Sequence, residues 1–164
     1  MARWLASLVL LAGAFVGRSR DVSKHEAVDI RASLYFQEAG QFGTDNIVAG
    51  DSEAPPLHHA LTGGFHGQGP SGATLVLVKV RGTFASSSQR GSVRLTAKPG
   101  DRILADRSAQ LSDFYSAERT EIWIPFLVYG TGCGGELKLT ASTRSPQQNV
   151  ESTVTRAIAF DCSE

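Results

Sequence analysis

Three histidines near the middle of the chain are the residues whose types most readily suggest chemistry. His58 and His59 are adjacent, and His66 follows seven residues after His59. Imidazole and carboxylate groups together suit zinc or copper. Further donors nearby in the sequence or elsewhere in the chain are Asp51, Glu53 and His25. Neighbouring side chains on a strand point to opposite faces, and the spacing matches no known ligand pattern. One alternative is a metal site at His58, His59 and His66, which would make the chain a metal-binding protein or a metal-dependent enzyme. The other is a loop with unconnected histidines.

The two cysteines, Cys133 and Cys162, suggest a structural bridge rather than a reactive site. The sequence has no C-x-x-C pair, and no histidine follows Cys133. An exported chain with two cysteines favours a disulfide, and closing a loop of this length adds roughly 3–4 kcal/mol of stability. A reactive thiol or a metal ligand is the alternative.

No set of residues with the spacing of a catalytic centre emerges. The run GDSE at 50–53 resembles the opening of the GDS-type esterase motif, but it departs from that motif at Glu53, and no histidine follows position 66 to act as a base. The carboxylate pairs Asp101 with Asp106 and Glu118 with Glu121 fall on expected turns and strand ends, where solvated side chains are usual. The sequence therefore predicts no catalytic residue and no cofactor, and it favours a non-enzymatic protein.

Three aromatic side chains have two interpretations. Trp123, Tyr129 and Tyr35 each have an apolar body and a polar end, so together they could form a face that stacks on sugars or peptides. Packing in the core is the expectation that burial statistics favour.

Composition limits the class of protein and of partner. The chain has 164 residues, 16 basic and 16 acidic side chains, and 17 glycines. This length fits one domain with a sizeable core. The balanced charge gives no basic surface for nucleic acid and no polybasic patch for a membrane. The partner is unknown from sequence, and a protein or a cell-envelope component is the expectation.

Residues 1–19 have the pattern of a signal peptide. Arg3 supplies a positive start, and the uncharged run 4–16 is too short to span a bilayer. Small residues precede two candidate cleavage sites, after Ala14 and after Ser19. The prediction is a secreted or periplasmic protein whose mature domain is 20–164, and the alternative is an uncleaved N-terminal anchor.

Period-2 alternation of apolar residues predicts about seven strands and almost no helix. The expected strands are 29–37, 73–84, 92–98, 102–106, 118–129, 135–143 and 150–162. The first of these segments has helix formers as well, and 108–117 fits either a helical turn or an irregular strand. Short strands joined by turns, such as Pro99-Gly100-Asp101, favour a single-domain antiparallel β-sandwich with one disulfide.

The segment 118–129 is expected to be the central strand. Apolar residues occupy both of its faces, which is typical of a strand in the middle of a covered sheet. Pro125 conflicts with that position, because proline cannot donate to a ladder and so requires a bulge or a sheet edge.

The segment 38–72 is rich in glycine and proline and has no clear period. A connection of this length without regular structure is usually functional or mobile. Leu57 to Leu61 fits one helical turn. The residues expected to attach the segment to the core are Phe42, Ile47, Val48, Leu57, Leu61 and Phe65. Because loops often carry function, the prediction is a binding or structural accessory protein that uses this loop as its contact surface.

Overall fold

A computed structural model describes residues 25–48, 57–58, 71–84, 91–116, 118–132, 135–145 and 152–161. The predicted signal peptide, both cysteines and most of the segment 38–72 lie outside these residues. Among the described residues, no helix is both long enough and apolar enough to cross a membrane.

The described chain consists almost entirely of β-strands. The strands are β1 (Glu26–Phe36), β2 (Gln41–Phe42), β3 (Leu57–His58), β4 (Ala73–Arg81), β5 (Ser92–Pro99), β6 (Ala105–Gln110), β7 (Glu121–Tyr129), β8 (Gly135–Arg144) and β9 (Ser152–Asp161). One turn of 3₁₀ helix, η2 (Leu111–Asp113), follows β6. Seven of these strands have six or more residues, which agrees with the predicted number.

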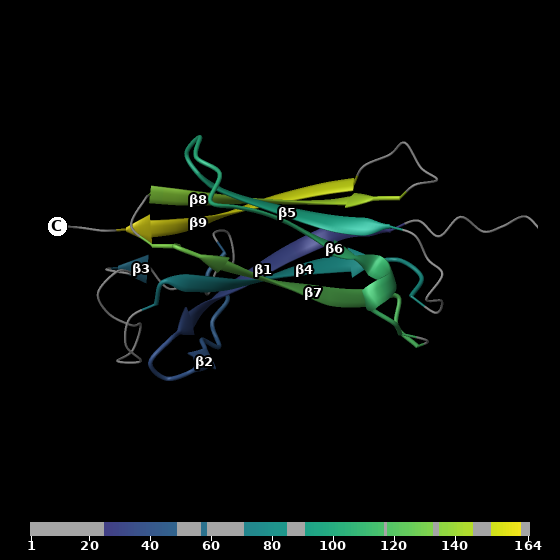
Figure 1. Cartoon of the computed structure of the whole chain (residues 1–164), viewed down its shortest axis with the longest axis horizontal. Helices are drawn as coiled ribbons and strands as arrows, with labels where there is room; N and C mark the ends of the chain where they lie inside the picture. The colour runs from purple at the N-terminus through teal and green to yellow at the C-terminus, as the bar shows by residue number, and fades with distance from the viewer. Residues whose placement is uncertain are drawn as a thin grey trace, which may run out of the picture.

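The strands form two sheets that lie over each other as layers (Figure 1). One sheet has four strands in the order β2-β1-β4-β7, and the other has five in the order β3-β9-β8-β5-β6. The pairing is antiparallel except for the short parallel contact between β3 and β9. The predicted all-β antiparallel class is confirmed, and the arrangement is sandwich-like.

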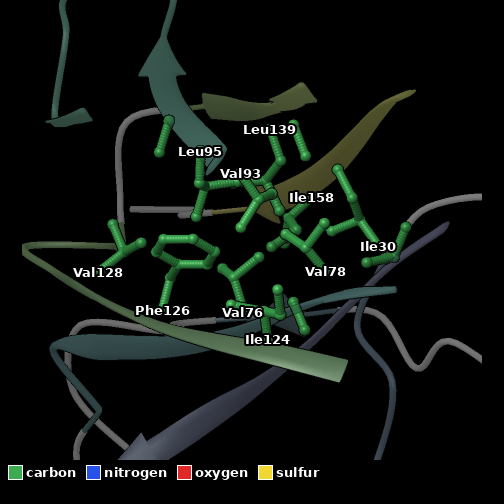
Figure 2. Packing of buried hydrophobic residues seen from close by; sticks show 14 of the residues in the cluster. Ile30, Val76, Val78, Val93, Leu95, Ile124, Phe126, Val128, Leu139 and Ile158 are labelled. Carbon is green, nitrogen blue, oxygen red and sulfur yellow. The ribbon is translucent and has the colours of Figure 1, made fainter. Parts of the chain in front are cut away.

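The core lies between the two layers because each long strand alternates in burial. On β4, Val76, Val78 and Val80 are fully buried, while their neighbours at odd positions are not. Leu95 and Leu139 face them from the other sheet, and Figure 2 shows side chains of both sheets meeting in one cluster. Period-2 patterning places every second side chain on one face, so the sequence alternation itself builds this core.

The hairpin between β5 and β6 begins with the predicted turn. Gly100 has a φ of 56°, a conformation that side chains with a Cβ rarely adopt, and the Arg102 N–H donates to the Pro99 carbonyl oxygen. The returning strand starts at Ala105 rather than at the predicted 102. It extends to Gln110, into the segment whose structure the sequence left ambiguous, and the helical turn there is η2.

The prediction that 118–129 lies in the middle of a sheet is wrong, because β7 is an edge strand that pairs only with β4 among the described strands. Its backbone explains Pro125. The Gly130 N–H donates to the Gly72 carbonyl and the Gly82 N–H to the Thr120 carbonyl, so residues at even positions of β7 bond to β4. Hydrogen-bonded pairs alternate in an antiparallel ladder, so the nitrogen of Pro125 faces the open edge, where no donor is needed.

The beginning of the predicted contact loop packs against β1. The Gly43 and Ile47 N–H groups donate to carbonyl oxygens of Leu34 and Ala32, so this segment continues along the edge of the sheet. Ile47 and Val48 are buried as expected, whereas Phe42 is 47% exposed. Leu57 and His58 form β3 beside β9 instead of the expected helical turn.

Candidate binding surface

The structure does not bring the histidines together within its described part. His58 pairs through its backbone with Asp161 at the end of β9, and His59 and His66 lie outside the described residues. His25 is buried against the residues that follow β4, where its Nε2 lies 3.1 Å from the Thr83 carbonyl oxygen and its ring contacts Phe84. The described residues contain no group of three or more potential metal ligands.

The carboxylates considered for acid–base chemistry lie at the surface. Asp106 accepts a hydrogen bond from Arg94 Nε at 2.6 Å, and Glu121 accepts one from Arg81 Nε at 2.9 Å. In both cases the hydrogen bond from the guanidinium group is the main cause of a lowered pKa. A carboxylate held in its charged form by an exposed arginine is a poor general acid, which agrees with the solvated interpretation.

The three aromatic residues lie on the outside of the four-stranded sheet, so the expectation of core packing is wrong for them. Tyr129 is 64% exposed, and Trp123 and Tyr35 are half-buried. All three occupy odd positions, and in β1 and β7 the even positions point into the core. The parity of each strand therefore assigns these rings to the outer face.

The middle of this face is apolar. Leu77 lies opposite Pro125, and Leu75 lies opposite Leu127, in adjacent rows of the β4–β7 ladder. Three of these side chains are half-buried, and Pro125 is exposed. We call the following eight residues the outer apolar face: Tyr35, Phe42, Leu75, Leu77, Trp123, Pro125, Leu127 and Tyr129.

One end of the outer apolar face is aromatic. Tyr35 and Phe42 are cross-strand partners whose ring centroids are 4.8 Å apart. Tyr35 also pairs with Ala73, which pairs with Tyr129. Phe42, Tyr35 and Tyr129 therefore lie in one row across four strands. Tilted ring contacts of this kind stabilise the sheet surface and add about 0.5–1.5 kcal/mol beyond the area they bury.

The other end is charged and of mixed sign. Trp123 lies under two cations, with the Arg31 guanidinium carbon 5.0 Å and the Lys79 Nζ 4.9 Å from its ring. Glu121 bridges two cations, at 3.4 Å from Lys79 Nζ and 2.8 Å from an Arg81 nitrogen. We call the following six residues the charged end: Glu26, Asp29, Arg31, Lys79, Arg81 and Glu121.

The outer face of the five-stranded sheet differs in character. We call it the polar face. Its side chains on β5, β6, β8 and β9 are mainly hydroxyl-bearing or charged: Ser92, Arg94, Thr96, Lys98, Asp106, Ser108, Gln110, Glu136, Lys138, Thr140, Ser142, Arg144, Thr153 and Thr155. The Arg94–Asp106 ion pair and the contact between the hydroxyl groups of Thr140 and Thr155 lie within it.

The outer apolar face is the most distinctive surface feature of the described residues. The sequence identifies the aromatic residues as candidates, but it does not tell which side of the sheet they occupy. The side of the sheet could have been predicted by comparing β4 with β7. Leu75, Leu77 and Leu127 give both strands apolar side chains at odd positions as well as at even ones. With Pro125 marking β7 as an edge, that second apolar stripe indicates an exposed face.

Comparisons with known proteins leave the function open. No family model matches the chain. No curated protein matches it either. One similar solved structure is titled "Crystal structure of the C-terminal domain of wzt", with 15% identity, 85% of this chain and 74% of that chain covered, and a TM-score of 0.46. A likeness of this degree carries no argument about what this chain does.

Proposed function

We propose that this chain is an exported, non-enzymatic binding or structural accessory protein, and that its contact surface is the outer apolar face. The observation that carries the proposal is the exposure of contiguous apolar side chains from β2, β1, β4 and β7 on one side of the molecule. Single exposed apolar residues are common on soluble proteins. A contiguous patch with a polar border is typical of a site that contacts a partner.

The location of this face revises the predicted contact surface. The loop 38–72 was expected to make the contacts, but its described beginning follows the edge of β1 through hydrogen bonds to Ala32 and Leu34. Only Phe42 of that beginning joins the outer apolar face, through its contact with Tyr35. Rigid strands position the remaining side chains, which lowers the entropy that a partner must remove on binding.

Co-sedimentation with the envelope fraction of the producing cells tests the proposal. A double variant, Leu75→Ser with Leu127→Ser, removes the apolar centre of the face without touching the core. Its matched control, Thr140→Ser with Thr155→Ser, changes the polar face by the same number of residues. We expect the unchanged protein and the control to co-sediment, and the apolar-face variant to remain in the supernatant.

Two results would contradict the proposal. One is a folded apolar-face variant that co-sediments as well as the unchanged protein. The other is unchanged protein that does not associate with the envelope at all. Circular dichroism and the melting temperature establish that each variant is folded before it is compared.

Export is part of the same proposal. Its support is the charge and hydrophobicity pattern of residues 1–19, whose cleavage after Ala14 or Ser19 would leave the whole described domain intact. N-terminal sequencing of the protein from the periplasm or the medium tests it. A protein that is recovered only from the cytoplasm and still begins at Met1 would contradict it.

A disulfide between Cys133 and Cys162 within a β-sandwich is the finer structural proposal. The described residues contain no cysteine, but the register of the β8–β9 ladder supports the pairing. Leu137 of β8 lies opposite Ile158 of β9, and Gly135 lies opposite Phe160. Moving toward the start of β8 therefore means moving toward the end of β9 by the same number of residues. In the sequence, Cys133 and Cys162 are each two positions beyond the last pair of this ladder, Gly135 with Phe160, and this equal spacing is what supports the proposal.

Opposite residues of antiparallel strands have Cα atoms about 4.5–5.5 Å apart, within the range that a disulfide spans. In an oxidising compartment the two thiols transfer two electrons and two protons to an incoming disulfide by thiol–disulfide exchange. We expect no free thiol in the unfolded, unreduced protein, and a loss of roughly 3–4 kcal/mol of stability on reduction. Two free thiols in the exported protein would refute the bridge.

The metal site at His58, His59 and His66 stays a second, untested prediction. The β3–β9 contact brings the backbone of His58 beside that of Asp161. Metal analysis of the purified protein, with a His58→Ala, His59→Ala and His66→Ala variant as control, decides it. Stoichiometric zinc or copper that disappears in the variant would favour this function over simple partner binding.

A further inference from the structure

We propose that the outer apolar face binds a second copy of this chain, so that the protein forms a symmetric dimer through its four-stranded sheet. This inference rests on the proposed function, since it names a partner for the same face. Four observations support it: the size of the face, the balance of its charges, the state of the β7 edge and the character of the opposite face.

The size of the face suits a small protein–protein interface. β4 and β7 have nine residues each, and β1 has eleven. With about 3.3 Å per residue and 4.8 Å between strands, these three strands cover roughly 30 Å by 14 Å, and β2 extends the area on one side. Stable interfaces bury about 600 Å² or more of accessible surface per partner. The flat area of the three strands is below this limit, and protruding side chains raise the accessible surface toward it. A weak dimer that dissociates on dilution is therefore expected.

The charges of the face are compatible with self-association. The charged end has three acidic residues, Glu26, Asp29 and Glu121, and three basic residues, Arg31, Lys79 and Arg81. In a two-fold interface the same surface occurs on both sides, so a patch of one sign would repel its copy. Residues of both signs let opposite charges of the two copies meet, although Asp29 is also bound by Arg156 of β9 at 3.3 Å, and the whole chain has a formal net charge of +0.

The arrangement along the face fits a two-fold axis that lies in the plane of the interface and runs across the strands. Such an axis through the apolar centre, near Leu77, places the charged end of each copy over the aromatic end of the other. Arg81 of one copy would then lie opposite Ala73 of the other, beside the rings of Tyr35 and Tyr129 in the same row. Cation–π contacts of this kind contribute about 0.5–1 kcal/mol at exposed sites and more when water is excluded.

Association through the β7 edge is a weaker alternative. Residues at odd positions of β7 direct their backbone groups toward the open edge, and Pro125 removes the donor from the middle of that row. The polar face is also a poor candidate, because its threonines and charged residues bury little apolar area. Of the three surfaces compared, the outer apolar face gains the most hydrophobic free energy when it is covered.

Sedimentation equilibrium of the full chain at several protein concentrations tests the proposal. The unchanged protein should pass from monomer to dimer as concentration rises. Leu77→Arg places two like charges against each other at the axis and should abolish the dimer at concentrations where the unchanged protein is dimeric. The matched control, Thr155→Arg on the polar face, adds the same charge at an exposed strand position and should dimerise normally.

Mixing two variants tests the symmetry directly. Leu77→Arg and Leu77→Glu should each be monomeric alone and should form a heterodimer when mixed, because residue 77 of one copy faces residue 77 of the other. A wild-type chain that stays monomeric at every concentration overturns the proposal, as does a folded Leu77→Arg variant that still dimerises. Failure of the mixed variants to associate overturns the two-fold arrangement.

These results separate the dimer from the proposed function. If the chain is monomeric but the Leu75→Ser, Leu127→Ser variant still loses envelope binding, the face contacts a different partner and only the dimer is refuted. If that variant changes neither association nor envelope binding, the face is not a contact surface and both proposals fail.

Discussion

The two outer faces of this molecule are built from strands of similar length over one shared core, yet they differ in what they present to solvent. On β4 and β7 most outward positions carry leucine, tyrosine, tryptophan or proline, with Lys79, Arg81 and Glu121 at one end, whereas on β5 and β8 they carry mainly threonine, serine, lysine and arginine. The inward positions of both sheets are alike, with Val78 and Leu139 equally inaccessible. Folding requires only the inward pattern, so the difference between the outer faces points to a role outside the fold.

The four-stranded sheet is protected at both of its edges. The free side of β1 is covered by residues 43–48, which donate backbone hydrogen bonds to it, and β7 carries Pro125 at its open side. Both features hinder the addition of another strand. The four-stranded sheet thus combines an exposed apolar face with protected edges, which favours contacts through the face.

The largest expected effect separates inward from outward leucines. Leu139→Ala should cost about 2–5 kcal/mol of unfolding free energy, because it leaves a cavity in the shared core. Leu77→Ala, the same substitution on the outer apolar face, should cost about 1 kcal/mol, because a half-buried side chain loses only part of its transfer free energy. Urea unfolding of each variant, at a concentration where the protein is monomeric, measures the difference.

Equal losses for the two variants would contradict the comparison. They would mean that the outer apolar face is covered within the single chain. In that case Leu77 would belong to a second core, and neither partner binding nor dimerisation would follow from its position.

The next effect concerns the open edge. Pro125→Val should leave the monomer about as stable as before, since valine suits a strand and the position bonds to no partner on the β4 side. It should increase association at high concentration, because it restores the missing N–H on an exposed edge. Light scattering during concentration measures this, with Leu127→Val as the control for added β-branching on the same strand. An unchanged onset of association would show that proline does not protect this edge.

Much of the fold follows from the sequence because burial alternates with period 2. That pattern gives seven long strands, their inward residues and the turn at Gly100 directly. It does not give the order of strands in space. Apolar residues on both sides of β7 are typical of a central strand, and only the backbone pairing shows that one of those sides is open.

The candidate surface was harder to predict for the same physical reason. Trp123, Tyr35 and Tyr129 are types that statistics place in cores, and parity within one strand does not tell which side faces the second sheet when both sides are apolar. Pro125 was the informative residue, since it is incompatible with a strand that is paired on both sides. Phe42 joins the surface through β2, a contact of only two residue pairs that no periodicity signals.

The smallest expected effect compares one carboxylate from each face. Hydrogen bonds from arginine lower the pKa of Glu121 at the charged end and of Asp106 on the polar face. A carboxyl group whose pKa is lower in the folded chain than in the unfolded chain stabilises the fold above its unfolded pKa. That contribution is lost as the pH falls through the folded pKa, so stability should decline below about pH 4. Because both groups are exposed, each contribution is small and decreases as salt is added.

Glu121→Gln and Asp106→Asn should each reduce this acid-dependent loss slightly, as measured by melting temperature between neutral and acid pH. The comparison becomes sharper at concentrations where the protein dimerises. Glu121 belongs to the proposed interface and Asp106 does not. Protonation of Glu121 removes the carboxylate that Lys79 and Arg81 share in each copy, whereas protonation of Asp106 changes no charge in the interface. Acid should therefore weaken the dimer in the unchanged protein and in Asp106→Asn alike, whereas Glu121→Gln should start from a weaker dimer and respond less to pH. An equal acid response of the dimer in all three proteins would place Glu121 outside the interface.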